Sequence, residues 1–148
     1  MFKHILIASD GSQLAQKAET AGLNLAKQLG AQVTAVTVTE PWDSLVMADL
    51  AERNVTNPVA DYEACVAVEA NRILRAIEEA AKKNGVVCGI LHIKDSQPAA
   101  GIIVTAKERG CDLIVMASHG RRGISRALLG SQATKVVTLS SVPVLVCR

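Results

Sequence analysis

The chain has 148 residues, a net charge of +2 and 49% hydrophobic residues, which suffices for one domain over 1–148 to bury a core without disulfides or structural metals. With three aromatic residues and interspersed charges, it offers neither a base-stacking surface nor a field that attracts polyanions, so we expect no nucleic-acid partner. The apolar runs are too short for a signal peptide or a membrane span, so we expect a cytoplasmic protein with no membrane partner.

Cysteine and histidine spacing argues against a metal centre. The histidines do not occur in pairs at zinc-ligand spacing, and no CxxC motif is present. We therefore expect no metal bound by these side chains, and buried free thiols in a reducing compartment. The thiols concerned are Cys65, Cys88, Cys111 and Cys147.

Apolar runs alternate with amphipathic stretches along the chain. A continuous apolar run is typical of a strand buried on both faces of a parallel sheet, whereas apolar residues at helical spacing predict a helix packed on that sheet. The predicted strands are 5–8, 32–38, 86–93, 111–116 and 142–146. The first predicted helix has Asp10 or Ser12 as its cap and closes at Gly30. The second spans 62–84, the third runs from Pro98 to Gly110, and the fourth begins near Ser131.

One region, 39–58, breaks this alternation. It contains Pro41 and Pro58, mixed charges and the single tryptophan, and it is too long for a simple turn. We expect a lid-like loop with a short helix over 45–50.

Strands that alternate with helices predict an α/β fold, with a parallel sheet, right-handed crossovers and helices on both faces. Ligands of such sheets bind at the carboxyl ends of the strands, where the strand order reverses. If the first and fourth strands flank that point, the turn at 9–11 lies beside residues 117–120.

The segment 117–131 reads ASHGRRGISRALLGS and joins a predicted strand to a predicted helix. Its glycines allow backbone N–H groups to approach a ligand, and we expect Ser131 at the helix N-cap, an arrangement suited to an anion. Ordinary turn and cap chemistry is the alternative. The segment is not a Walker loop, because Ser131 rather than lysine follows Gly130, and it contains no GxGxxG motif.

From Lys3 to Cys147 the chain resembles the universal stress protein family. ATP-binding members carry glycine, two residues, glycine, nine residues, then glycine with Ser or Thr, and Gly120, Gly130 and Ser131 match this spacing. The turn SDGS at 9–12 and the closing run VPVLV at 142–146 also resemble the family. Ala117 replaces the first glycine. If that position required a positive φ, alanine would cost about 1–2 kcal/mol; an extended Ala117 would be tolerated.

The resemblance implies an open, twisted, five-stranded Rossmann-like sheet, similar to the adenine nucleotide alpha-hydrolase fold, with strand order 3-2-1-4-5. It further implies an adenine nucleotide lying across the strand ends, as ATP with or without Mg²⁺. In this reading, the base and ribose contact Ala8, Ser9, Asp10 and Val38; the ribose and first phosphates contact Met116, Ala117, His119 and Gly120; and the outer phosphates contact Gly130, Ser131 and Gln132.

Several roles remain open from the sequence. Asp10 either faces ligand donors or Mg²⁺, or caps a helix. His119 is expected to pack in the loop or contact ribose, because nothing in the sequence supplies a nucleophile beside it. Of Arg121, Arg122 and Arg126, we expect at most one to reach a phosphate.

The leading hypothesis is therefore a cytoplasmic stress-response protein that binds ATP as a regulatory ligand and is not an enzyme, with slow ATP hydrolysis at most a side activity. We also expect a homodimer, because an uncovered apolar edge strand at the carboxyl terminus favours two-fold pairing. One alternative is a family member without nucleotide that acts as a dimeric interaction module, for which Ala117 argues. Another is a flavin or dinucleotide enzyme on a similar sheet, against which the missing GxGxxG motif argues.

Overall fold

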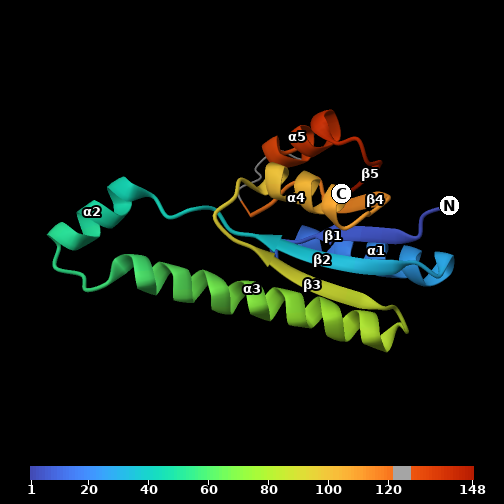
Figure 1. Cartoon of the computed structure of the whole chain (residues 1–148), viewed down its shortest axis with the longest axis horizontal. Helices are drawn as coiled ribbons and strands as arrows, with labels where there is room; N and C mark the ends of the chain where they lie inside the picture. The colour runs from blue at the N-terminus through green and yellow to red at the C-terminus, as the bar shows by residue number, and fades with distance from the viewer. Residues whose placement is uncertain (122–127) are drawn as a thin grey trace.

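The computed structural model describes residues 1–121 and 128–148. Strands and helices alternate through most of the chain, and two helices follow the second strand (Figure 1). The elements are β1 (His4–Ala8), α1 (Gln13–Leu29), β2 (Gln32–Val38), α2 (Ser44–Glu52), α3 (Pro58–Lys83), β3 (Cys88–Ile93), α4 (Pro98–Glu108), β4 (Leu113–Ala117), α5 (Ser131–Leu139) and β5 (Val144–Cys147).

The five strands form one parallel sheet in the order β3-β2-β1-β4-β5, which confirms the predicted order. β1 lies at the centre, where Ile5 pairs with Val33 of β2 and with Leu113 of β4. The strand order reverses between β1 and β4, because β2 and β3 lie on one side of β1 whereas β4 and β5 lie on the other. The switch point therefore lies at the carboxyl ends of these two strands.

Helices cover both faces of the sheet. Ile5, Ile7 and Val115 belong to the apolar cluster that contains the buried residues of α1, whereas Leu6 and Ile114 belong to the cluster under α4 and α5. Successive side chains of a strand point to opposite faces, and here both faces are buried. This burial explains why the strands read as continuous apolar runs rather than alternating ones.

The helix α1 begins and ends as the sequence predicts. The Ser12 hydroxyl accepts a hydrogen bond from the Ala15 N–H at 3.2 Å, and Gly30 closes the helix in the left-handed conformation with φ 64°. Of the two predicted caps, Ser12 therefore fills the role, and Asp10 is free for another. In the middle of the helix, a Cβ at Gly22 would lie 2.7 Å from Cδ1 of Ile7, so glycine lets α1 approach the sheet closely.

The region predicted as a lid contains a longer helix than expected. Asp43 caps α2 through its side chain, which accepts from the N–H groups of Leu45 and Val46. The helix α3 begins at Pro58, four residues before the predicted start, because proline is well suited to a first helical turn. Together α2 and the first turns of α3 project beyond the carboxyl ends of the strands (Figure 1). Met47 is the buried residue of α2.

Candidate functional site

Two loops meet at the carboxyl ends of β1 and β4, as the strand order predicts. The Asp10 carboxylate joins them: Oδ1 accepts from the Ser12 N–H at 2.9 Å, and Oδ2 accepts from the Arg121 N–H at 2.9 Å. One side chain thus fixes both the turn after β1 and the start of the segment 117–131 after β4, called the glycine loop below. Asp10 acts here as a cross-link between loops rather than as the cap of α1.

Gly120 and Gly130 are needed for space. A Cβ at Gly120 would lie 2.7 Å from Oδ2 of Asp10, and a Cβ at Gly130 would lie 3.0 Å from the Ser118 carbonyl oxygen. Neither glycine has a positive φ. A loop glycine can supply either a positive φ or room for a close approach of two chain segments. Both of these glycines supply room.

Ala117, which replaces a glycine of the family pattern, is the last residue of β4. It pairs with Cys147 of β5 and is 9% exposed. Its backbone is extended, and the non-glycine residues of positive φ in the described chain are Asn54, Asn57 and Asp95. Alanine is thus compatible with the backbone at this position.

The N-cap of α5 differs from the prediction by one residue. Gly130, with φ −62° and ψ 160°, is the N-cap, and Ser131 is the first helical residue. The expectation that Ser131 caps the helix is therefore wrong. The physical reason is a tertiary contact, since the Gly130 N–H donates to the Ser118 carbonyl at 2.8 Å and fixes the turn one residue earlier. Because Gly130 has no side chain, it supplies no acceptor to the first-turn N–H groups of α5.

The Gln132 side chain has a structural partner on α4. Its Oε1 accepts from the Ala99 N–H at 3.0 Å, which satisfies a donor in the first turn of α4. The N-cap residue of α4, Gln97, makes no such side-chain bond. A contact of Gln132 with phosphate is thus most readily made by its backbone.

Ser9 and Glu19 form a cluster below the turn after β1. The Ser9 hydroxyl donates to the Glu19 carboxylate and accepts from the Gly11 N–H at 3.0 Å, while the Thr37 hydroxyl donates to the Ser9 carbonyl at 3.0 Å. Burial raises the pKa of Glu19, the hydrogen bond from Ser9 opposes this, and the nearby Asp10 charge raises it further. The sequence prediction missed Glu19, although it lies on the same face of α1 as Ala15, Ala18 and Gly22.

The other predicted nucleotide contacts divide into core and loop positions. Ala8 and Met116 are 8% and 7% exposed and belong to the core cluster under α4 and α5, and Val38 packs against that cluster at the end of β2. These three therefore reach the strand ends chiefly through their backbone. His119 is partly buried, and its Nδ1 lies 3.0 Å from the hydroxyl of the adjacent Ser118.

Arg121 is tied to α3. Its guanidinium donates to Glu69 Oε1 at 2.8 Å, and Arg72 binds the same carboxylate through two further hydrogen bonds. These contacts lower the pKa of Glu69 to about 2, Arg72 contributing most and Arg121 next. Arg122 and Arg126, like Gly123, lie outside the described residues.

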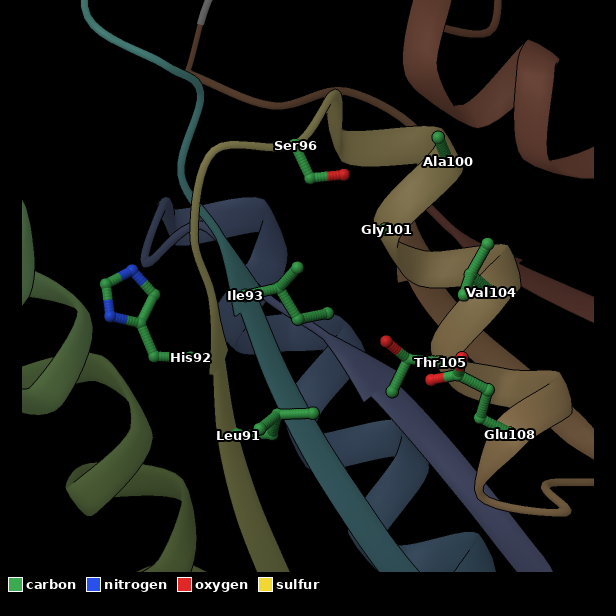
Figure 2. Close-up of a pocket in the computed structure, with 9 residues that line it drawn as sticks. All are labelled: Leu91, His92, Ile93, Ser96, Ala100, Gly101, Val104, Thr105 and Glu108. Carbon is green, nitrogen blue, oxygen red and sulfur yellow. The ribbon is translucent and has the colours of Figure 1, made fainter.

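A groove of about 370 Å³ lies between β3 and α4, and no residue of the turn at 9–12 lines it (Figure 2). At its upper end Gly101 packs closely, since a Cβ there would lie 3.1 Å from Ser96 Oγ and 3.2 Å from Val38 Cγ1. The groove thus borders the predicted adenine position without including it. Its lining comprises Leu91, His92, Ile93, Ser96, Ala100, Gly101, Val104, Thr105 and Glu108.

Free cysteines occupy different environments. Cys111 is buried, and burial raises the pKa of its thiol to about 11. Cys65 is exposed on α3, so the prediction of buried thiols is wrong for this residue, and Cys88 and Cys147 are only partly buried. Across residues 1–121 and 128–148, no three His, Cys, Asp or Glu side chains gather as a metal site would require, and no helix has the length and hydropathy to cross a bilayer.

Comparison with known proteins agrees with this fold. A sequence model described as the universal stress protein family matches residues 1–148. The chain belongs to the universal stress protein family. It is 33% identical to the universal stress protein YxiE of Bacillus subtilis and 30% identical to a universal stress protein of Thermus aquaticus, each alignment covering 100% of both chains.

Solved structures of this family share the architecture. Universal stress protein UspA from Lactobacillus plantarum superposes with a TM-score of 0.83 at 23% identity, over 99% of this chain and 98% of that one. A universal stress protein in complex with cAMP gives 0.73 at 22% identity, over 99% and 97%. An Archaeoglobus fulgidus protein in complex with dAMP gives 0.69 at 19% identity, over 100% and 98%.

Proposed function

We propose that this protein binds an adenine nucleotide, with ATP as its regulatory ligand, at the carboxyl ends of β1 and β4. The observation that carries the proposal is the close packing of the two loops around Asp10, Gly120 and Gly130. This packing requires glycine at position 130, the N-cap of α5, so the N-cap residue offers no side-chain acceptor to the first turn of that helix. Uncapped N–H groups at a helix N-terminus favour phosphate, and the helix dipole adds to this preference.

Related structures support the adenine part of the proposal. Two family members with the same fold were solved with cAMP and dAMP, which share an adenine base and a phosphate. The choice of ATP rests on the spacing of Gly120, Gly130 and Ser131, which resembles that of ATP-binding members. Mg²⁺ would accompany the phosphates. Asp10 has the oxygen chemistry for such a metal, because each of its oxygens accepts one N–H and retains a second lone pair.

We further propose a regulatory rather than catalytic role, exerted in the cytoplasm. Phosphoryl transfer requires metal-holding carboxylates and a positioned water. In the described part of the site the Asp10 carboxylate accepts two backbone N–H groups, and Glu19 is hydrogen bonded to Ser9. The proposed output of nucleotide binding is therefore a change in conformation or assembly, with slow hydrolysis at most a side activity.

Assembly is proposed to occur through β5, as a homodimer. β5 is the last strand of the sheet, and Leu145 on it is 39% exposed. An apolar edge strand of this kind is stabilised when a second copy covers it. Light scattering at micromolar concentration tests this proposal. We expect a dimer for the native chain and a monomer for Leu145→Lys, and a native chain that is monomeric throughout would contradict it.

Isothermal titration with ATP in the presence of Mg²⁺ tests the nucleotide proposal. We expect saturable binding below millimolar ATP, and about a tenfold loss of affinity in Gly130→Ala, whose Cβ would press on the Ser118 carbonyl. Gly89→Ala is the matched control, because a Cβ at Gly89 meets nothing within 4 Å. Absence of binding at millimolar ATP would refute the proposal and favour an interaction module without nucleotide. Fast steady turnover would indicate an ATPase instead.

A further inference from the structure

The Glu69 carboxylate on α3 binds two arginines from different parts of the chain. Arg72, three residues further along the same helix, donates through Nε to Oε2 at 2.9 Å and through one terminal nitrogen to Oε1 at 2.8 Å. Arg121, at the start of the glycine loop, donates to Oε1 at 2.8 Å. Glu69 therefore ties the glycine loop to α3 through an ion pair that spans 52 positions in the sequence.

This loop-to-helix ion pair can open without leaving Glu69 unsatisfied. Arg72 alone occupies both carboxylate oxygens, so the departure of Arg121 leaves a bidentate pair behind. The side chains of Arg121 and Glu69 are 54% and 39% exposed. An ion pair with this much solvent around it is weak and is easily replaced by a better partner.

The Arg121 guanidinium already lies beside the proposed nucleotide site. Its terminal nitrogen is 3.2 Å from the position that a Cβ at Gly11 would take, so it lies over the turn after β1. The backbone N–H of the same residue is bound to Asp10. The root of the side chain is therefore fixed at the strand ends, while the guanidinium is free to change partner by rotation of its own side chain.

Phosphate groups are better partners for a guanidinium than a shared carboxylate is. They carry more charge and present paired oxygens that match the guanidinium fork. Because Oε1 of Glu69 is shared between two arginines, it offers Arg121 only a single hydrogen bond. The outer phosphates of a nucleotide held at the start of α5 would thus compete with Glu69 for Arg121.

We propose that Arg121 exchanges Glu69 for the outer phosphates when a nucleotide binds, and that this exchange releases the glycine loop from α3. The inference rests on the proposed function and adds its regulation. Glu69 then opposes the binding of nucleotides that carry outer phosphates and has no effect on adenosine. The structural consequence is a loosened connection between the loop and α3, whose first turns project with α2 beyond the carboxyl ends of the strands (Figure 1).

Titration of the full chain and its variants with ATP and adenosine tests the exchange. Glu69→Gln removes the competing charge, so we expect ATP affinity to rise roughly two- to fivefold, with adenosine affinity unchanged. Arg121→Gln is expected to lower ATP affinity. In the Arg121→Gln background, Glu69→Gln should have no further effect, which separates the exchange from any influence of the freed Arg72.

Glu78→Gln is the matched control. Glu78 lies on the same helix, pairs with Arg75 at the same i,i+3 spacing, and is 38% exposed against 39% for Glu69. We expect its ATP affinity to equal that of the native chain. An unchanged or lowered ATP affinity in Glu69→Gln, or an equal gain for adenosine, would overturn the exchange while leaving nucleotide binding intact. A native chain that binds neither ligand would overturn both proposals.

Discussion

The Asp10 carboxylate accepts a hydrogen bond from the Arg121 N–H at 2.9 Å across 111 positions of sequence. Its second oxygen accepts from the Ser12 N–H, so one side chain holds the turn after β1 against the start of the loop after β4. A charged acceptor that serves two backbone donors stabilises the loops more than a neutral one does. The geometry of the proposed site therefore depends on Asp10.

Replacing Asp10 by asparagine tests this role. The amide keeps one acceptor oxygen and loses the charge, so one of the two N–H groups loses its partner. We expect the free energy of unfolding to fall by about 1–2 kcal/mol, measured by urea denaturation. Asp49→Asn, which breaks an exposed pair with Arg53, is the control and should change it by less than about 0.5 kcal/mol. Equal effects of the two substitutions would contradict the cross-linking role.

Ala117→Gly separates the two hypotheses for the glycine loop. Ala117 is extended and 9% exposed at the end of β4, so glycine adds flexibility without relieving strain. We expect ATP affinity within twofold of the native value and a loss of about 0.5–1 kcal/mol in stability. A large gain in ATP affinity would show that alanine blocks the site, and would support the interaction module as the native function.

Gln132→Ala tests the link between α5 and α4. Removing Oε1 leaves the Ala99 N–H without its partner, so we expect a loss of about 1 kcal/mol in the free energy of unfolding. ATP affinity should change little, because only the Gln132 backbone is proposed to contact phosphate. Gln97→Ala is the control, since that side chain makes no cap bond. A large loss of ATP affinity without a loss of stability would instead assign the side chain to the ligand.

Cys111 predicts a loss of stability at high pH. Burial raises the pKa of its thiol from 9.0 to about 11 in the folded chain, so the folded state favours the protonated thiol. The resulting contribution to the free energy of unfolding, about 2–3 kcal/mol, is fully present below about pH 9 and is lost as the pH rises towards 11. Urea denaturation at pH 8 and at pH 10.5 measures the difference.

Cys111→Ala should show a smaller fall in stability between these two pH values than the native chain. Cys65→Ala is the control, because Cys65 is exposed and its removal should leave the fall unchanged. Identical falls in all three proteins would mean that Cys111 contributes nothing to the pH dependence.

The sequence predicts the architecture well because the strands are short, apolar and buried on both faces. Asp10 lies close to Gly120 because β1 and β4 are neighbours in the sheet; the residue patterns leave this order conditional, and the family resemblance implies it. Local signals also predict the Ser12 cap and the Gly30 end of α1. These features depend on neighbours in sequence or on a periodicity that the chain displays.

Features that depend on distant contacts were not predictable in this way. The N-cap of α5 is Gly130 rather than Ser131 because the Gly130 N–H donates to the Ser118 carbonyl. The spacing of Glu19 places it on the buried face of α1, but no local pattern indicates that its partner is Ser9. The Glu69 pair with Arg121 joins a helix to a loop that the chain reaches only after two further strands. Such contacts follow from packing, which residue patterns do not specify.

Backbone amide NMR during titration with ATP tests the central proposal most directly, because it locates the ligand as well as detecting it. We predict saturable shifts at Gly11, at Ala117 to Gly120 and at Gly130 to Gln132, with little change at Ala100 and Val104 beside the groove between β3 and α4. Shifts confined to that groove, or no saturable shifts at millimolar ATP, would contradict a nucleotide site at the ends of β1 and β4.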